Sequence, residues 1–378
     1  MHTEFLMGNA AIARGAIAAG LNLAAGYPGT PSTEVLETAA KENDGSLYIE
    51  WSVNEKAALE LGAGASYAGA RSLITMKQVG LNVASDPLMS LAYIGVKGGM
   101  VILVADDPGP ISSQTEQDTR TFAAYSKLPC FDPSSVQEAY DLIQEAFEWS
   151  EKYHTPVLFR PTTRIDHGYA SITVKDPGEY VKNIPEGFVK DSSKWVIFPR
   201  LSRIAHEQIA KREPVLSKEF SAYERNSVSV LRKDACAGGN PEKSPSEQLP
   251  ALCTHGISYA YTMDALRLLL DQGFKEAENI PVLKIATPYP FPEELALEFL
   301  RGRKEVLCIE ELDPVIERNL TYIAGKHHLP VTVRGKLTGD ITPAGENTVE
   351  SAAEAIRKFL TGNAAESAEG PDARPDAP

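Results

Sequence analysis

Four polar stretches in the N-terminal half of the sequence carry residue types that could do chemistry. They are "GYPGTPS" at 26–32, the turn before Glu55, "KQVGLN" at 77–82, and "DDPGPISSQTEQD" at 106–118. We expect each stretch to lie in a loop between predicted strands and helices. Because ligands of open parallel sheets bind at the carboxyl ends of the strands, on loops that precede helices, the four stretches should line one crevice.

Glu55 is the first candidate for catalysis. A glutamate at a dry helix N-terminus with a raised pKa could share a proton with a heteroaromatic nitrogen. The spacing Ser52-x-x-Glu55 also fits a capping box, in which Glu55 only satisfies the backbone N–H of Ser52. Spacing alone favours the capping box.

The other stretches have equally plain alternatives. The "PGTP" segment could offer backbone N–H groups and the Thr30 hydroxyl to an anion, or be an ordinary Pro-Gly turn. The polar run from Ser112 to Asp118 suits substrate recognition, or a solvated loop that caps a helix. Lys77 could face an anionic ligand or a neighbouring carboxylate.

Further polar residues have weaker claims. His255 in "THGISY" could meet a phosphate near a helix N-terminus, although a lone histidine is more often structural. Asp106 and Asp107 could bind a metal, but no third ligand stands at a useful spacing, so capping of the adjacent turn is favoured. A loop or interface acid cluster is expected from Glu310, Glu311 and Asp313.

Composition limits the class of protein. The 378 residues include 43% hydrophobic and 23% charged residues, which fits a soluble globular protein of two or three domains. The net charge of −14, without a cluster of Lys and Arg, argues against nucleic acid as a partner. The N-terminus lacks a basic region before its apolar stretch, and no run is long enough to cross a membrane, so we expect a cytoplasmic protein.

The four cysteines, Cys130, Cys236, Cys253 and Cys308, form no C-x-x-C pair. This spacing excludes a self-contained iron–sulfur cluster or zinc ribbon, and we expect isolated thiols and no metal site in this chain.

The elements that must position the N-terminal candidates alternate between strand and helix. Near-continuous apolar runs closed by polar residues predict strands buried on both faces, and 3.6-residue periodicity predicts helices. Predicted strands are 47–51, 72–78, 99–107 and 155–163, and predicted helices are 8–21, a capped helix from Ser32 or Thr33 to Lys41, 53–69 and 134–153. This order predicts a parallel α/β sheet.

The alternation of strands and helices stops between about 170 and 250, where we expect a connector with a local helix near 203–226 and a loop at 234–250. It resumes with predicted strands in "ALCTH", "PVLKIATPYP", "EVLCIEE" and "PVTVRGKLTG", and with helices after the first three. The expected domains are 1–168, a connector at 169–248, a second α/β domain at 249–362 and a disordered tail at 363–378.

Several long motifs carry a family resemblance. They are "LAAGYPGTPSTEV", "EWSVNEKAALELGAGASYAGARSLITMKQVGLN" and "VADDPGPISSQTEQDTR", with "GISYAYTMDAL", "TPYPFPEE" and "EELDPVIE" in the second half. With them the chain closely resembles the α-subunit family of indolepyruvate:ferredoxin oxidoreductases, in the 2-oxoacid:ferredoxin oxidoreductase superfamily. The likeness covers 8–165 and 250–360 and is most specific over 51–120.

The resemblance implies a thiamine diphosphate enzyme, with a pyrimidine-binding first domain and a transketolase-C-terminal-like second domain. Glu55 matches the glutamate that hydrogen-bonds the pyrimidine N1′ and exchanges a proton there, which makes the capping box a minority interpretation. The implied cofactor-binding residues are Tyr27, Pro28, Thr30, Glu55, Gln78 and Asn82, and the implied substrate-binding residues are Thr30, Lys77, Gln114 and Thr115.

The chain departs from the family pattern at the substrate carboxylate anchor. Related pyruvate enzymes carry an arginine near the end of the strand that reads "VILVADD" here, where Asp106 and Asp107 stand. Lys77, Thr30 or a residue of a partner chain could replace that arginine.

A larger departure is the lack of the "GDG" motif for Mg²⁺ and diphosphate and of the cysteine-rich segments for [4Fe-4S] clusters. We therefore expect a split subunit or a truncated piece that is inactive alone. It would act in a hetero-oligomer with a thiamine-diphosphate-binding and iron–sulfur domain or subunit and a β subunit. The reaction is expected to be oxidative decarboxylation of an arylpyruvate or another 2-oxoacid, with coenzyme A as co-substrate and ferredoxin as electron acceptor. The alternative is a non-catalytic scaffold or regulatory module that retains the fold.

Overall fold

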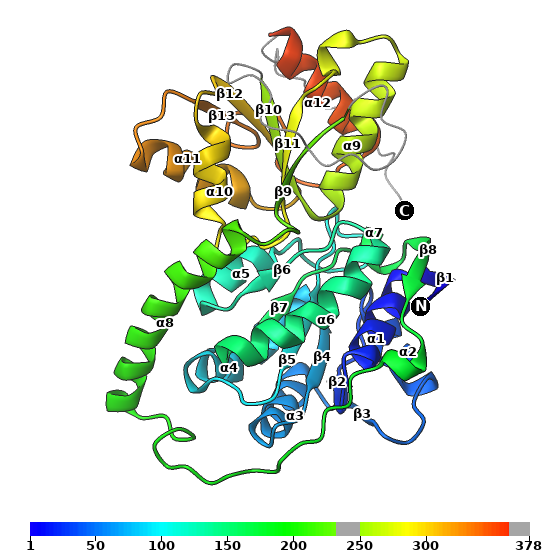
Figure 1. Ribbon diagram of the computed structural model, residues 1–378, viewed down its shortest axis with the longest axis vertical. Helices are drawn as coiled ribbons and strands as arrows, with labels where there is room; N and C mark the ends of the chain where they lie inside the picture. Colours follow the sequence, from blue (N-terminus) through cyan, green and yellow to red (C-terminus); the bar gives the residue numbers. More distant parts are fainter. Residues whose placement is uncertain (232–249, 363–378) are drawn as a thin grey trace, which may run out of the picture.

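The structure is a computed structural model and describes residues 1–231 and 250–362. Two α/β units, each built on its own sheet, lie one above the other in Figure 1. The predicted fold class, two parallel-sheet α/β units, is confirmed. Within the described ranges no helix is both long and apolar enough to cross a membrane.

The first unit contains a six-stranded sheet in which every pair of neighbours is parallel. In sheet order its strands are β3 (Tyr48–Trp51), β2 (Leu23–Gly26), β4 (Ser72–Lys77), β5 (Met100–Ala105), β7 (Val157–Phe159) and β6 (Cys130–Phe131). The helices of this unit are α1 (Gly8–Ala18), α2 (Thr33–Lys41), α3 (Glu55–Tyr67), α4 (Gln78–Ile94), α5 (Thr119–Ser126), α6 (Val136–Tyr153) and the short α7 (Thr163–Asp166).

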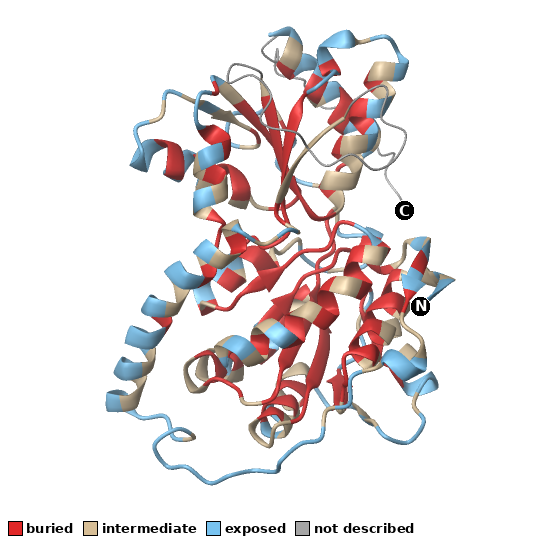
Figure 2. Ribbon diagram, viewed as in Figure 1, coloured by how far each residue is buried: buried red, intermediate tan, exposed pale blue. Residues whose placement is uncertain are grey.

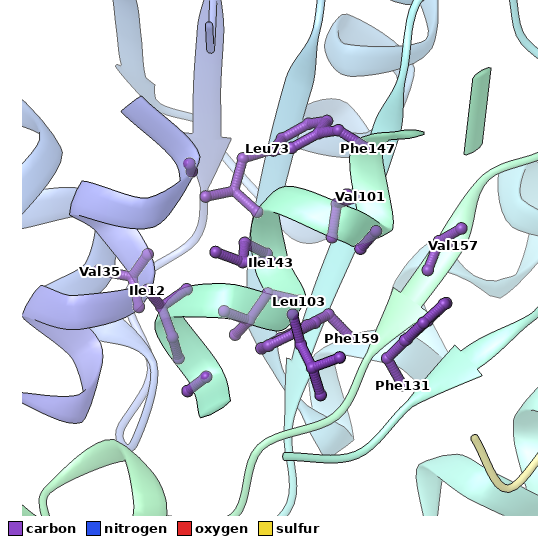
Figure 3. Close-up of a cluster of buried hydrophobic side chains, with 14 of the residues drawn as sticks. Ile12, Val35, Leu73, Val101, Leu103, Phe131, Ile143, Phe147, Val157 and Phe159 are labelled. Atoms are coloured by element: carbon purple, nitrogen blue, oxygen red, sulfur yellow. The ribbon is translucent and has the colours of Figure 1, made fainter. Parts of the chain in front are cut away.

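Helices cover both faces of this sheet, which explains the near-continuous apolar runs of its strands. In β5, Val101 and Leu103 pack toward α1, α2 and α6, whereas Ile102 and Val104 pack toward α3 and α4. Figure 3 shows the first of these layers, with Ile143 of α6 among the strand side chains. Figure 2 shows the buried strands and the exposed outer faces of the helices.

Three local predictions for this unit are wrong. Residues 23–26, which follow the helix predicted at 8–21 and were not predicted as a strand, form β2, because Gly20 with φ +79° ends α1 and the Ala-rich segment then pairs with β3 and β4. The expected loop at 77–82 begins α4 at Gln78. The N-terminal residues form β1 (His2–Met7), which pairs antiparallel with β8 (Tyr169–Val174), a strand inside the predicted connector.

After β8 and a 3₁₀ turn at Pro177–Glu179, the chain follows the edge of the first unit and enters α8 (Pro199–Ser221), close to the predicted helix at 203–226. Leu216 and Phe220 of α8 join the core of the first unit. The predicted loop at 234–250 lies almost wholly outside the described residues, as does the predicted tail.

The second unit contains the sheet β13-β12-β10-β11-β9. Its strands are β9 (Ser227–Val230), β10 (Ala251–His255), β11 (Pro281–Ile285), β12 (Glu305–Ile309) and β13 (Thr332–Arg334). Its helices are α9 (Gly256–Asp271), α10 (Glu293–Leu300), α11 (Val315–Lys326) and α12 (Val349–Thr361), with a 3₁₀ turn at Lys275–Ala277.

Only β9 is antiparallel to its neighbour, and it comes from the predicted connector. The helix α12, which packs with α9 on one face of this sheet, is absent from the sequence-based prediction. The domain limits expected from the sequence stay predictions.

Candidate functional site

The four polar stretches do follow the carboxyl ends of four neighbouring strands, β3, β2, β4 and β5, although the stretch after β4 is the first turn of α4 and not a loop. Two hydrogen bonds hold the loop after β2 in place. The side-chain amide of Asn9 donates to the Pro31 carbonyl at 2.7 Å, and the Gly29 N–H donates to the Thr33 hydroxyl at 3.0 Å. Tyr27 is 43% exposed and Thr30 is exposed, so the loop turns these two side chains outward.

The predicted side-chain cap of α2 is wrong. Ser32 is the N-cap residue, but its hydroxyl donates to the Gly29 carbonyl at 3.1 Å rather than accepting from the helix. The hydroxyl therefore fixes the loop after β2 instead of the helix terminus, and the peptide bond between Thr30 and Pro31 is cis.

Glu55 is not part of a capping box. The helix α3 begins at Glu55, its N-cap is Asn54, and the Asn54 side chain accepts from the Ala57 N–H at 2.9 Å. The Ser52 N–H donates instead to the Gly26 carbonyl at 2.9 Å. The interpretation that spacing alone favoured is therefore wrong, and the Glu55 carboxylate is available for another role.

The half-buried Glu55 side chain lies against the first turn of α4. A Cβ added to Gly80 would stand 2.5 Å from Glu55 Oε1 and 2.7 Å from its Cγ, so only glycine leaves room for this carboxylate. Among the described residues no group donates a hydrogen bond to Glu55 Oε1 or Oε2. A carboxylate held by packing but left without a donor has capacity for a ligand.

The start of α4 holds the loop that follows β5. Gln78 is buried, and its amide donates to the Thr115 carbonyl at 3.0 Å and accepts from the Ser113 hydroxyl at 3.4 Å. Asn82 donates to the Gln117 side chain at 3.0 Å. Gln78 and Asn82, both predicted to bind the cofactor, thus fasten the 112–117 loop to the helix.

Lys77 lies between two of the loops. Its ammonium group donates to Gln114 Oε1 at 3.4 Å, and its aliphatic stem passes beside Gly29. No carboxylate of the described ranges lies within 4.0 Å of it, so the alternative that Lys77 pairs with a neighbouring acid is wrong. The structure brings the predicted substrate-binding residues Lys77, Gln114 and Thr115 close to one another at the start of α4. The loop after β2 touches the same region, because the Ser112 hydroxyl donates to the Thr30 carbonyl at 3.5 Å.

Asp106 and Asp107 are both occupied by protein donors. Asp106 accepts from the Thr119 hydroxyl at 2.6 Å and from Arg160 Nε at 2.6 Å, and burial raises its pKa to about 6. Asp107 accepts from the Ser112 N–H at 2.8 Å and from a threonine hydroxyl. Burial opposes its ionisation, but these hydrogen bonds lower its pKa overall. The expected capping of the adjacent turn is confirmed for Asp107, whereas Asp106 binds the more distant Thr119 and Arg160. No cluster of three or more metal-ligating side chains occurs in the part of the chain that the structure describes.

A buried arginine behind the site joins the two units. Arg120, on α5, pairs with Asp118 at 2.6 Å and with Glu310 of the second unit at 2.9 Å. It also donates to the carbonyls of Glu311 at 2.6 Å and Asp313 at 2.9 Å. The expected interface role of this acid cluster is confirmed. Arg120 was not among the predicted site residues, and its one signal in the sequence is that it is the single charged residue of α5, "TRTFAAYS".

His255 belongs to the same network. Arg120 donates to its Nε2 at 2.9 Å, so its Nδ1 carries the proton and donates to Asp132 at 2.5 Å. Burial lowers the pKa of His255 to about 4, and the ring is neutral at pH 7. Since both nitrogens are taken, the phosphate-binding alternative is wrong and the structural one is confirmed.

Comparison with known proteins identifies related chains. Residues 14–217 match the family described as pyruvate flavodoxin/ferredoxin oxidoreductase, thiamine diphosphate-binding. The indolepyruvate oxidoreductase subunit IorA of Pyrococcus abyssi is 39% identical over 363 residues, which are 94% of this chain and 52% of that protein. The chain therefore spans about half the length of the curated relatives it matches.

Two solved structures share the fold. The 2-oxoglutarate:ferredoxin oxidoreductase from Magnetococcus marinus, with 2-oxoglutarate, coenzyme A and succinyl-CoA bound, gives a TM-score of 0.73 at 16% identity and covers 95% of this chain and 65% of that chain. A split gene transketolase, an inactive beta4 tetramer, gives a TM-score of 0.57 at 15% identity and covers 94% of this chain and 96% of that chain.

Proposed function

Since the chain belongs to the thiamine diphosphate-binding family of pyruvate flavodoxin/ferredoxin oxidoreductases, we propose that it supplies the pyrimidine-side half of a 2-oxoacid:ferredoxin oxidoreductase active site. The proposed substrate is indolepyruvate or a related arylpyruvate, in line with the name of the relative that is 39% identical. The proposed reaction takes the 2-oxoacid and coenzyme A to acyl-CoA and carbon dioxide, and two electrons pass to ferredoxin.

The observation that carries the proposal is the Glu55 carboxylate. It stands at the N-terminus of α3, half-buried against Gly80, and the described residues offer it no donor. A heteroaromatic nitrogen that shares a proton fits such a group, because the helix N-terminus favours the charged carboxylate and the packing fixes its position.

Each candidate residue has a task in this proposal. Thiamine diphosphate, when bound, supplies the carbon nucleophile that attacks the 2-oxo carbonyl. Glu55 holds the proton at the pyrimidine. Tyr27, Pro28 and Thr30 form the wall beside it, and Gln78 and Asn82 keep the 112–117 loop in place.

Lys77 is the proposed anchor for the substrate carboxylate. Its charge faces an amide oxygen instead of an acid. Arg120 and Arg160 both pair with carboxylates. Arg160 Nη2 has no hydrogen-bond partner among the described residues, but both arginines are fully buried and therefore do not reach the surface beside Lys77. Thr30, Gln114 and Thr115 would add hydrogen bonds around the same ligand.

The rest of the catalytic machinery is assigned to sequence outside these 378 residues, either on the same polypeptide or on a partner. A thiamine-diphosphate-binding and iron–sulfur domain or subunit would bring Mg²⁺, the diphosphate site and [4Fe-4S] clusters, and a β subunit and ferredoxin would complete the hetero-oligomer. The relative from Pyrococcus abyssi, of which this chain covers 52%, has room for such a further domain. We propose a cytoplasmic location for the complex, as expected from the sequence.

The test combines the chain with its partner polypeptides, thiamine diphosphate, Mg²⁺, coenzyme A and indolepyruvate, and follows reduction of a redox dye. Glu55→Gln should lower the rate about 10²- to 10⁴-fold, since it removes an acid–base group but keeps the shape. Glu60→Gln, an exposed change on the same helix, serves as the matched control and should leave the rate unchanged. Full activity of Glu55→Gln would refute the mechanism, and a parent chain that supports no turnover would favour the scaffold alternative.

A further inference from the structure

A second cleft lies at the opposite edge of the first sheet from Glu55. It has a volume of about 660 Å³ and is bounded by the C-terminal ends of α4 and α6, by residues 193–197, and by α8. Because α4 begins at the carboxyl edge of the sheet, its C-terminal end at residues 92–95 marks the amino edge. A volume of this size suits a small organic ligand.

The charge of the cleft is opposite to that of the protein. Lys152, Lys194, Lys211 and Arg212 line it, and no described aspartate or glutamate does, although Lys152 pairs with Glu219 at 2.5 Å. The whole chain carries a net charge of −14, so this cation-rich lining is a local departure. Such a lining favours an anionic ligand by attraction within a concave surface.

Arg212 is the most buried of the four cations, since Lys152, Lys194 and Lys211 are exposed whereas Arg212 is half-buried. Its Nε has no hydrogen-bond partner among the described residues, and its Nη2 donates to the Lys127 carbonyl at 3.3 Å. No described carboxylate lies within 4.0 Å of it, although the adjacent Glu213, which pairs with Lys127, favours its charge. Burial lowers the pKa of Arg212. A carboxylate bound in the cleft would supply a charge-assisted hydrogen bond to this guanidinium.

The remaining walls are apolar. Tyr93 and Ile94 of α4 line the cleft together with Ile197, Leu201 and Ile204. Ile197 and Ile204 are 42% and 38% exposed, so their apolar side chains are accessible from the cleft. The cleft therefore combines apolar surface with the half-buried guanidinium of Arg212.

We propose that this cleft binds a small amphipathic carboxylate, with the acid head on Arg212 and the apolar body between α4 and α8. One half-buried guanidinium matches one monoanionic head, and the planar fork of arginine suits a carboxylate. The site is separate from the proposed thiamine diphosphate site and does not depend on that function.

The test is calorimetric titration of the full chain with octanoate and with 1-octanol, which has the same apolar body without the charge. Octanoate should bind saturably and 1-octanol more weakly. Arg212→Gln should weaken octanoate binding about 10- to 100-fold, the loss of one charge-assisted hydrogen bond. It should leave 1-octanol binding unchanged.

A second variant keeps Arg212 in place. Gln208 lines the cleft four residues before Arg212 on α8, so Gln208→Glu puts a carboxylate on the same helix face and should compete with octanoate. Arg203→Gln removes an exposed charge of the same helix that does not line the cleft, and should have no effect.

The proposal is overturned if octanoate does not saturate the chain, if 1-octanol binds as tightly as octanoate, or if Arg203→Gln weakens binding as much as Arg212→Gln. Equal octanoate affinity in Gln208→Glu and the parent chain would also overturn it. Circular dichroism and thermal unfolding of each variant verify that the fold is intact.

Discussion

Gly80→Ala tests whether the position of the Glu55 carboxylate matters. The new Cβ would lie 2.5 Å from Glu55 Oε1, 2.7 Å from Cγ and 2.9 Å from Cδ. Non-bonded atoms need about 3.5 Å, so the end of the Glu55 side chain must move by about 1 Å. The backbone can remain in place, because the atoms that meet the Cβ belong to the end of a half-buried side chain.

The expected effect on activity is large. Displacing a catalytic group by about 1 Å can cost about 100-fold in rate, and we expect a loss of that order in dye reduction by the reconstituted enzyme. Stability should change in the other direction or not at all. Alanine is favoured over glycine in helices by up to about 1 kcal/mol, which offsets the steric repulsion.

Gly64→Ala is the matched control. Gly64 lies within α3, is exposed, and has nothing within 4 Å of an added Cβ. This variant should gain a similar helix-propensity term while keeping full activity. Thermal unfolding of each chain and dye reduction with the same partners give the two measurements.

The claim that catalysis depends on the position of the Glu55 carboxylate is refuted if Gly80→Ala retains as much activity as Gly64→Ala. It is also refuted if the loss of activity in Gly80→Ala is accompanied by an equal loss of folded protein. Glu55→Asp in the Gly80→Ala background offers a further check. The shorter side chain withdraws from the new methyl group, so the two substitutions should be less than additive.

The other predictions concern stability. Arg120→Gln leaves Asp118 and Glu310 buried without their partner and should lower the free energy of unfolding by about 3–5 kcal/mol in urea titrations; a change as small as that of Arg203→Gln would contradict this. Phe220→Ala empties a fully buried position against Trp149 and should cost about 3–5 kcal/mol in the same assay. Burial raises the pKa of Glu311 to about 7 from 4.5, so its contribution to stability is present below pH 4.5 and is lost as the pH rises through 7. Glu311→Gln should match the parent near pH 5 and exceed it above pH 7, by at most about 3 kcal/mol; parallel stability curves would exclude this.

Local sequence pattern was sufficient for most of the fold. The strands β4, β5, β7, β10, β11 and β12 are mostly apolar because helices bury both of their faces, and this composition can be recognised in each segment without knowledge of its partners. The placement of the four candidate loops at one sheet edge also followed, since it depends only on strands being parallel and sequentially connected.

Elements stabilised by distant partners were missed. The strand β1 pairs with β8, more than 160 residues away in the chain, and β2 is an Ala-rich segment that is extended because β3 and β4 flank it. Neither segment has a strong intrinsic preference for a strand, so tertiary pairing decided its conformation.

The sequence by itself determined the residue types at the candidate site, the α/β class and the family resemblance. Only the tertiary structure decided between the roles that those residues could have. The capping box at Glu55 failed because the Ser52 N–H donates to the Gly26 carbonyl, and the carboxylate fits against Gly80 without a hydrogen-bond donor among the described residues. Hydrogen bonds and close contacts between segments that are far apart in the chain depend on the tertiary structure, and the spacing of residues in the sequence does not predict them.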